Sequence, residues 1–210
     1  MVQKPRGIEP KLTLGCPRSY SWAPRITVRY IEVLMALLRI AKLGNPVLRK
    51  IAAPVDPQEI KTPAFQQFLD DMFETMEEAS GIGLAAPQVS RSQQVVVMSC
   101  AGEGGFPATV LINPKIVFYG STLAEFWEGC LSVDGLRGQV TRPSSVRVQA
   151  LDRSGTPQDI EASGLYATCI QHEMDHLIGK VFLDRMTDLS TLSQLEEFSE
   201  YWQKEHSTVI

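Results

Sequence analysis

The sequence QHEMDHL occupies residues 171–177 and contains two of the chain's three histidines. His172 and His176 are four positions apart, so in an α-helix their imidazole rings lie on one face, one turn apart. In that arrangement they can bind one divalent metal ion, and Glu173 beside them can act as a base. Two histidines satisfied within a core, or a chance occurrence of a short motif, are the alternative interpretations.

The surrounding residues predict the helix that contains this stretch. A helix over about residues 163–178 is expected, and Gly179 ends it. Its mostly apolar face includes Leu165, Thr168 and Cys169, one or two turns before the histidines. Ionisable rings turned toward such a core need a partner, which a metal ion provides. The sequence therefore favours a metal site on a buried helix.

A catalytic metal site needs a third protein ligand and one open position. Glu196 lies 20 residues after His176, a spacing similar to that of metalloproteases with two histidine ligands and one glutamate. Cys130 is the other candidate. The glycine before it allows close backbone approach, and a thiolate is a strong ligand for Fe(II) or Zn(II). Because Glu196 lies in an acidic amphipathic stretch, a solvent-exposed position is its simpler interpretation.

The remaining patterns predict an α+β fold. Thr62 and Pro63 have the character of an N-cap and first helical residue, and the helix that they begin ends by Gly81. Strands are expected at 94–98, 109–112, 115–119, 146–151 and 158–161. A final helix is expected from Leu189, with Leu192, Leu195, Phe198 and Trp202 on one stripe. We expect mixed, mostly antiparallel short strands around a central metal-bearing helix, followed by a C-terminal helix.

Charge divides the chain into two expected regions. Residues 1–34 contain six basic and two acidic side chains, whereas residues 35–210 contain 14 basic and 22 acidic ones. We expect a catalytic domain at 35–210 behind a basic extension, disordered, at 1–34. The extension is either an organelle transit peptide or a segment upstream of a true start at Met35. The second interpretation is favoured, because four prolines disrupt any amphipathic helix and coherent patterning begins at Met35.

Composition excludes several classes of protein. The acidic body argues against a nucleic-acid partner, because phosphate binding needs a basic surface. No apolar run reaches the roughly 18–20 residues that cross a bilayer. The four cysteines, at positions 16, 100, 130 and 169, form no C-x-x-C pair. Reduced thiols in a cytosol-like compartment are therefore expected.

Three segments occur together and in order: GIGLAAPQV at 81–89, EGCLS at 128–132 and QHEMDHL at 171–177. Together they closely resemble the three signature motifs of the peptide deformylases. The resemblance extends over the body from Met35 and leaves out residues 1–34. It implies removal of the N-formyl group from the formyl-methionine of nascent polypeptides, with release of formate.

The resemblance also implies the residues of the site. One divalent metal would be held by Cys130, His172 and His176, with Fe(II) as the native ion and Zn, Ni or Co as possible replacements. Glu173 would be the general base and then the acid. The Gln88 side chain and the Leu131 backbone N–H would stabilise the oxyanion.

Substrate binding is predicted from position within the same motifs. Ile82, Phe126, Leu165, Thr168, Cys169 and His172 are expected to line a slot for the methionine side chain, although core packing is the alternative for each apolar member. The backbone of Gly83 and Gly129 is expected to pair with an extended peptide. The resemblance further implies that Arg142 reaches Asp175 and orients the metal-bearing helix.

The expected partners are N-formylmethionyl peptides and nascent chains at the ribosome, without direct nucleic-acid binding or membrane association. The expected location is the bacterial cytoplasm, or an organelle if residues 1–34 are a transit peptide. Two other functions compete. An HExxH metalloprotease would use Glu196, and a catalytically silent, metal-binding or ribosome-associated protein would bind metal without deformylation.

Overall fold

The computed structural model describes residues 37–203, and the predicted extension at 1–34 lies outside them. Within the described residues, the helices are α1 (Pro57–Ile60), α2 (Pro63–Glu78), α3 (Gly164–Leu177) and α4 (Leu195–Glu197), and α4 continues as a π-helical turn over Phe198–Trp202. The strands are β1 (Gly83–Ala85), β2 (Val95–Cys100), β3 (Phe106–Tyr119), β4 (Leu123–Cys130), β5 (Val133–Pro143), β6 (Ser145–Leu151), β7 (Pro157–Ser163) and β8 (Ser193–Gln194). No helix in this part of the chain is long and apolar enough to cross a membrane.

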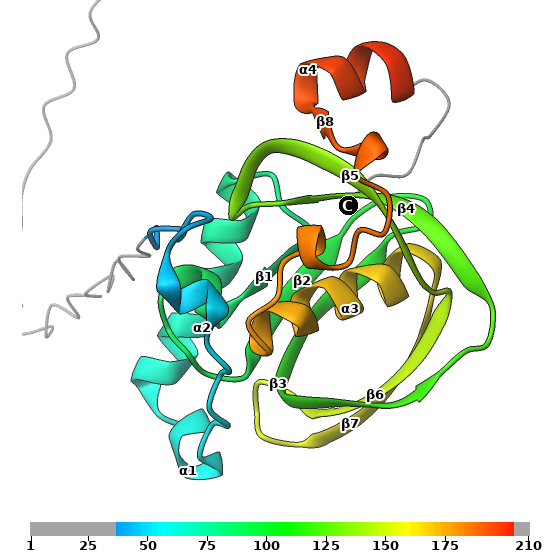
Figure 1. Ribbon diagram of the computed structural model, residues 1–210. Helices are drawn as coiled ribbons and strands as arrows, with labels where there is room; N and C mark the ends of the chain where they lie inside the picture. Colours follow the sequence, from blue (N-terminus) through cyan, green and yellow to red (C-terminus); the bar gives the residue numbers. More distant parts are fainter. Residues whose placement is uncertain (1–36, 204–210) are drawn as a thin grey trace, which may run out of the picture. The chain divides into compact units, whose positions relative to one another are not determined.

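A five-stranded antiparallel sheet with the order β1-β2-β3-β6-β7 separates the two longer helices. Val96 and Met98 of β2 belong to the core cluster that includes residues of α3, whereas Val95 and Val97 belong to the cluster that includes residues of α2. Successive strand residues point to opposite faces, so both faces of β2 are buried. Figure 1 shows α2 and α3 on opposite sides of β1 and β2.

The second sheet, with the order β4-β5-β8, brings the end of β4 close to α3. Strands β4 and β5 form a hairpin in which Cys130 pairs with Val133. Val133 and Val140 of β5 pack against Val181 and Phe182, which follow α3 in the chain. This packing holds the hairpin against the C-terminal end of the helix.

The predicted helices at Thr62 and at 163–178 are confirmed. The Thr62 side chain accepts a hydrogen bond from the Phe65 N–H at 3.3 Å, which satisfies an N–H at the start of α2. Gly179 follows α3 with φ +74°, a left-handed conformation that favours glycine. Local capping signals therefore gave the right boundaries for both elements.

The predicted start of the final helix at Leu189 is wrong. Residues Leu189–Thr191 form a 3-10 turn, in which the Asp188 side chain accepts from the Ser190 N–H at 2.8 Å. Strand β8 then pairs with β5, so helical structure begins only at Leu195. Pairing with a distant strand overrides the apolar spacing of this segment.

The sheet also differs from the expected strands in two places. The two strands expected at 109–112 and 115–119 form one strand, β3, with a register shift between Ile112 and Lys115 and a positive φ at Asn113. Strands β4, β5 and β1 were not predicted. Glycines at 129, 135 and 138 interrupt the alternation that would have indicated β4 and β5.

The end of α3 generates a stability prediction. A Cβ at Gly179 would lie 2.7 Å from the carbonyl carbon of Arg49, whereas a Cβ at Gly104, which has φ +75°, meets nothing within 4 Å. Gly104→Ala should lower the free energy of unfolding by about 1–2 kcal/mol, the cost of the left-handed conformation alone. Gly179→Ala should lower it by about 2–5 kcal/mol, because the overlap with backbone adds to that cost. Urea denaturation measures the free energy of unfolding of both variants. Equal losses of that free energy in Gly104→Ala and Gly179→Ala would contradict this account.

Candidate metal centre

Helix α3 turns its polar motif inward. His172 and Glu173 are each 3% exposed and His176 is 1% exposed. The two imidazole rings lie 5.2 Å apart between centroids at an angle of 75°. The helical spacing predicted from the sequence therefore places both rings on one buried face.

Cys130, at the end of β4, completes a cluster with these rings. Its Sγ lies 3.3 Å from Nε2 of His176. One ligand atom from each of Cys130, His172 and His176 lies within 4.8 Å of the others. A thiolate and two imidazoles are the donor types that Zn(II) and Fe(II) accept.

The protein alone does not satisfy all polar atoms of this cluster. Oε2 of Glu173 and Nδ1 of His176 are buried, and neither has a hydrogen-bond partner among the described residues. Buried polar atoms nearly always have partners, so the unpartnered Glu173 oxygen beside the cavity indicates a group that the protein itself does not supply. The residues present thus fit a bound metal ion beside a group that exchanges protons.

The environment of Cys130 favours the thiolate. Burial alone would raise the pKa of the thiol, but His176 and His172 oppose it and hold the pKa well below its ordinary value. The Ser132 N–H and the Gln88 amide also point at the sulfur, at 3.4 and 3.6 Å. Metal ions bind the thiolate form, so the site prepares its sulfur ligand.

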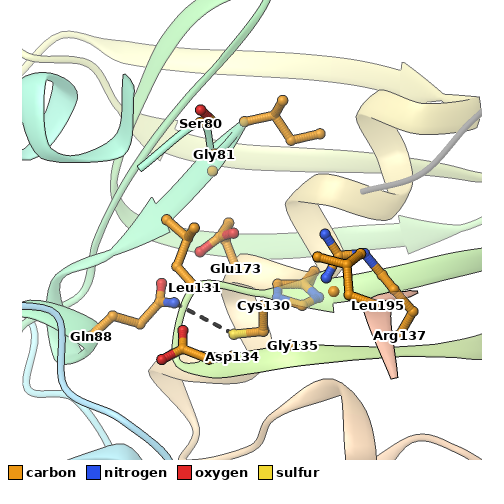
Figure 2. A pocket seen from close by; sticks show the side chains of 14 residues that line it. Ser80, Gly81, Gln88, Cys130, Leu131, Asp134, Gly135, Arg137, Glu173 and Leu195 are labelled. Carbon is orange, nitrogen blue, oxygen red and sulfur yellow. Dashed lines mark hydrogen bonds between the residues drawn. The ribbon is translucent and has the colours of Figure 1, made fainter. Parts of the chain in front are cut away.

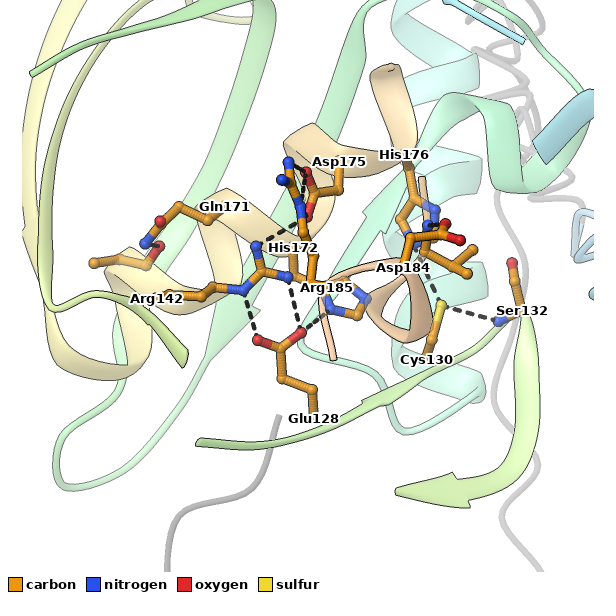
Figure 3. Close-up of polar contacts among 12 residues, drawn as sticks. Glu128, Cys130, Ser132, Arg142, Gln171, His172, Asp175, His176, Asp184 and Arg185 are labelled. Carbon is orange, nitrogen blue, oxygen red and sulfur yellow. Dashed lines mark hydrogen bonds and ion pairs between the residues drawn. The ribbon is translucent and has the colours of Figure 1, made fainter. Parts of the chain in front are cut away.

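A chain of buried ion pairs orients the His172 ring from behind (Figure 3). The Glu128 carboxylate accepts from Nδ1 of His172 at 2.8 Å and from Nε and Nη2 of Arg142 at 2.6 and 3.0 Å. Nη1 of Arg142 donates to Asp175 at 2.9 Å, as expected from the sequence, and Arg185 also donates to Asp175. Fixing the proton on Nδ1 of His172 leaves Nε2 free to bind a metal.

A cavity of about 320 Å³ opens beside the cluster (Figure 2). It is lined by Ser80, Gly81, Ile82, Gly83, Gln88, Gly129, Cys130, Leu131, Asp134, Gly135, Arg137, His172, Glu173 and Leu195. Burial raises the pKa of the Glu173 carboxyl to about 7, despite the opposing effect of the two histidine rings. A carboxyl with such a pKa can accept and return a proton near neutral pH.

A family model described as polypeptide deformylase matches residues 37–191. The chain belongs to this family. Peptide deformylase 2 of Xanthomonas axonopodis pv. citri is 49% identical over 156 residues, which are 74% of this chain and 90% of that protein. The peptide deformylase of Pseudomonas aeruginosa is 48% identical over 155 residues, with the same coverage.

Solved structures of deformylases share the fold. A Met-Ala-Ser-bound class I type b peptide deformylase from Acinetobacter baumannii has a TM-score of 0.70 at 37% identity, covering 73% of this chain and 100% of that one. A peptide deformylase from Synechococcus elongatus in complex with actinonin has a TM-score of 0.68 at 42% identity, covering 78% and 85%. The chain is thus a peptide deformylase by family, a hydrolase that removes the N-formyl group from nascent peptides.

The residues predicted for this deformylase site separate into two groups. Those predicted to bind metal or stabilise charge line the cavity, except His176, which lies in the cluster behind it, and the predicted substrate contacts Ile82, Gly83 and Gly129 line it as well. The other predicted contacts are not among the lining residues: Phe126, Leu165, Thr168 and Cys169. Thr168 and Cys169 are fully buried on α3, and the Cys169 Sγ contacts the Ile82 carbonyl at 3.7 Å. Their part in a methionine slot stays a prediction.

Glu196 does not join the cluster. It is exposed on α4, and the group of possible ligands within the described residues consists of Cys130 and the two histidines. The alternative of a protease with two histidines and one glutamate therefore has no geometric support.

Sequence reasoning gave no role in the site to Glu128, Arg137 or Arg185, and it placed Leu195 only on the apolar stripe of the expected final helix. Glu128 stands two residues before Cys130, and this proximity was the one signal available for it. Arg137 reaches the cavity because β5 pairs with β4, which brings its guanidinium against Gly129, and Leu195 reaches it because β8 pairs with β5. Arg185 meets Asp175 after the chain turns back at Gly179.

The ion-pair chain generates a prediction about metal affinity. Glu128→Gln should weaken metal binding by about 10–100-fold, because the neutral amide no longer balances Arg142 or holds the His172 proton. Glu125→Gln, an exposed change on the same strand, is the matched control and should leave affinity unchanged. Competition with a chelator measures the metal affinity of both variants. Equal metal affinities of Glu128→Gln and Glu125→Gln would contradict this role of Glu128.

Proposed function

We propose that Cys130, His172 and His176 hold one divalent metal ion, with Fe(II) as the native ion and Zn, Ni or Co able to replace it. The convergence of one thiolate and two imidazoles within 4.8 Å is the observation that carries this proposal. When bound, the ion supplies Lewis acidity, which makes hydroxide available from water near neutral pH.

Glu173 moves the proton in this proposal. Its buried carboxylate lines the cavity and follows His172 directly in the chain. It accepts the proton of the attacking water and delivers it to the amine nitrogen as the bond between the formyl carbon and that nitrogen breaks. The products are formate and a peptide with a free amino terminus.

Gln88 and Leu131 stabilise the negative charge that develops on the formyl oxygen. Oε1 of Gln88 accepts the Ala85 N–H at 2.7 Å, which fixes the amide with its NH₂ group toward Cys130. Nε2 also donates to Ser132 Oγ at 3.2 Å, so the amide is held in position from both ends beside the cavity. The Leu131 backbone N–H is the second donor, since Leu131 borders the same cavity.

The substrate is a peptide that begins with formyl-methionine. Strand β1 is an edge of the five-stranded sheet and contains Gly83, whose missing side chain leaves room for the Glu173 carboxylate. Edge backbone of this kind can pair with an extended peptide. Gly129 offers backbone on the opposite wall, and Ile82 borders the methionine side chain.

Nascent chains at the ribosome are the proposed partners, and the bacterial cytoplasm is the proposed location. The bacterial origin of the relatives and the reduced state of Cys100, Cys130 and Cys169 support this location. The acidic body argues against direct binding to ribosomal RNA.

Formate release from formyl-Met-Ala-Ser by Fe(II)- or Ni(II)-loaded protein tests the proposed function. We expect stoichiometric formate and free Met-Ala-Ser, the tripeptide bound in the Acinetobacter baumannii relative. Metal content is measured on the same sample. Absence of formate from protein that contains one metal per chain would overturn the proposal.

Glu173→Gln should retain metal and lower kcat by about 10²–10⁴-fold, because the amide cannot carry the proton. Glu196→Gln is the matched control and should keep both metal and activity, since Glu196 is exposed outside the cluster. Metal analysis and formate release measure the two properties separately. Near-normal turnover of Glu173→Gln would exclude Glu173 as the proton carrier.

Gln88→Glu should lower kcat by about 10²–10³-fold, because it removes one oxyanion donor. The glutamate keeps an oxygen that accepts the Ala85 N–H, so the loop should remain in place. A steady-state comparison of kcat and KM tests this, with KM expected to change little. A selective rise in KM would show that Gln88 binds substrate instead.

A further inference from the structure

The C-terminal segment Ser193–Trp202 contributes to the cavity from outside the family match. That match ends at residue 191, whereas Leu195 is among the residues that line the cavity. A role for Leu195 therefore has to be argued from this chain's own contacts.

Pairing with β5 fixes the start of the segment. Ser193 pairs with Arg137, and Gln194 pairs with Leu136. Arg137 itself lies against the backbone of Gly129, where even a single added carbon would overlap its guanidinium. The register of β8 thus places Leu195 directly beyond the wall that contains Gly129 and Cys130.

Aromatic packing fixes the other end of the segment. Phe198 is 2% exposed, and its ring centroid lies 4.8 Å from that of the buried Trp127 on β4. Trp202 packs on the same indole at 5.5 Å. Since Leu195 lies between β8 and these rings, its backbone is held from both sides.

Leu195 stands at the mouth of the cavity. Its exposed fraction is 41%, whereas His172 and Glu173 at the floor are each 3% exposed. Figure 2 shows Leu195 beside Arg137, on the other side of the cavity from Leu131 and Gln88. A half-exposed leucine on a wall that otherwise consists of glycines and polar groups offers an apolar contact to a bound chain.

We propose that Leu195 is a specificity-determining contact for the residues that follow the formyl-methionine, and that it favours apolar side chains there. This inference rests on the proposed function of the cavity. The formyl group has to reach Cys130 and Glu173 at the floor, so the rest of an extended peptide must pass the mouth. Each residue of an extended chain adds roughly 3.3 Å, so the residues that follow the formyl-methionine are the ones that pass the mouth where Leu195 stands.

Two substrates separate this contact from the chemistry. We expect Leu195→Ala to lower kcat/KM for formyl-Met-Leu-Leu by about three- to tenfold, mainly through KM, because an apolar contact of partly exposed groups is lost. The same variant should turn over formyl-Met-Ala-Ser within about twofold of the wild type, because small side chains gain little from the contact. Leu189→Ala, an exposed leucine that does not line the cavity, should affect neither substrate.

A charged variant gives an independent test. Leu195→Glu introduces an acid at the first residue of α4, where a carboxylate is well tolerated. Compared with the wild type, Leu195→Glu should have a higher ratio of kcat/KM for formyl-Met-Lys-Lys to kcat/KM for formyl-Met-Glu-Glu. Thermal unfolding of both Leu195 variants verifies that the fold is retained.

Each outcome is decisive. The role of Leu195 would be overturned if Leu195→Ala lost kcat/KM equally on both uncharged substrates. It would also be overturned if Leu195→Ala left kcat/KM unchanged on both and Leu195→Glu left the charge preference unchanged. Because wild-type formate release is measured in the same assay, failure of the proposed function would be seen separately, as inactivity on every substrate.

Discussion

The burial of His172 and His176 on one face of α3 is the constraint on which the rest of the structure depends. Ionisable rings removed from water need partners, and the described residues supply them only in part. Glu128 holds one nitrogen of the His172 ring, Arg142 neutralises and fixes Glu128, and Asp175 in turn pairs with Arg142. This chain of charges is stable because every member is paired, whereas an unpaired member would be costly at such burial. The proposed metal ion would complete the arrangement on the side that faces the cavity.

The β4–β5 hairpin supplies partners to the same two buried histidines from a second element of the fold. It brings Glu128 behind the rings and, two residues later, Cys130 in front of them. The pairing with β5 shifts register between residues 128 and 130, and this one strand supplies both the carboxylate that orients His172 and the thiol beside His176. Gly129 between them has no side chain, which leaves room for Arg137. The hairpin therefore links the proposed metal site to one wall of the cavity.

Local signals in the sequence predicted the parts of the structure that depend on neighbouring residues. The caps at Thr62 and Gly179 and the spacing of the histidines each have a short-range cause, so α2 and α3 were predicted correctly. Residue chemistry alone left Cys130 and Glu196 open as third ligands, and the resemblance to deformylases favoured Cys130. The positions of Arg137, Arg185 and Leu195 depend on strand pairing and chain reversal between distant segments, which no local pattern encodes. For the same reason the helix expected from Leu189 gave way to β8.

X-ray absorption spectroscopy of the metal-loaded protein tests the central claim most directly, because it identifies the ligand atoms without reference to activity. The account predicts one sulfur and two imidazole nitrogens from the protein around the ion, and loss of the sulfur signal in Cys130→Ser. An ion surrounded by nitrogen and oxygen alone in the wild-type protein would contradict it.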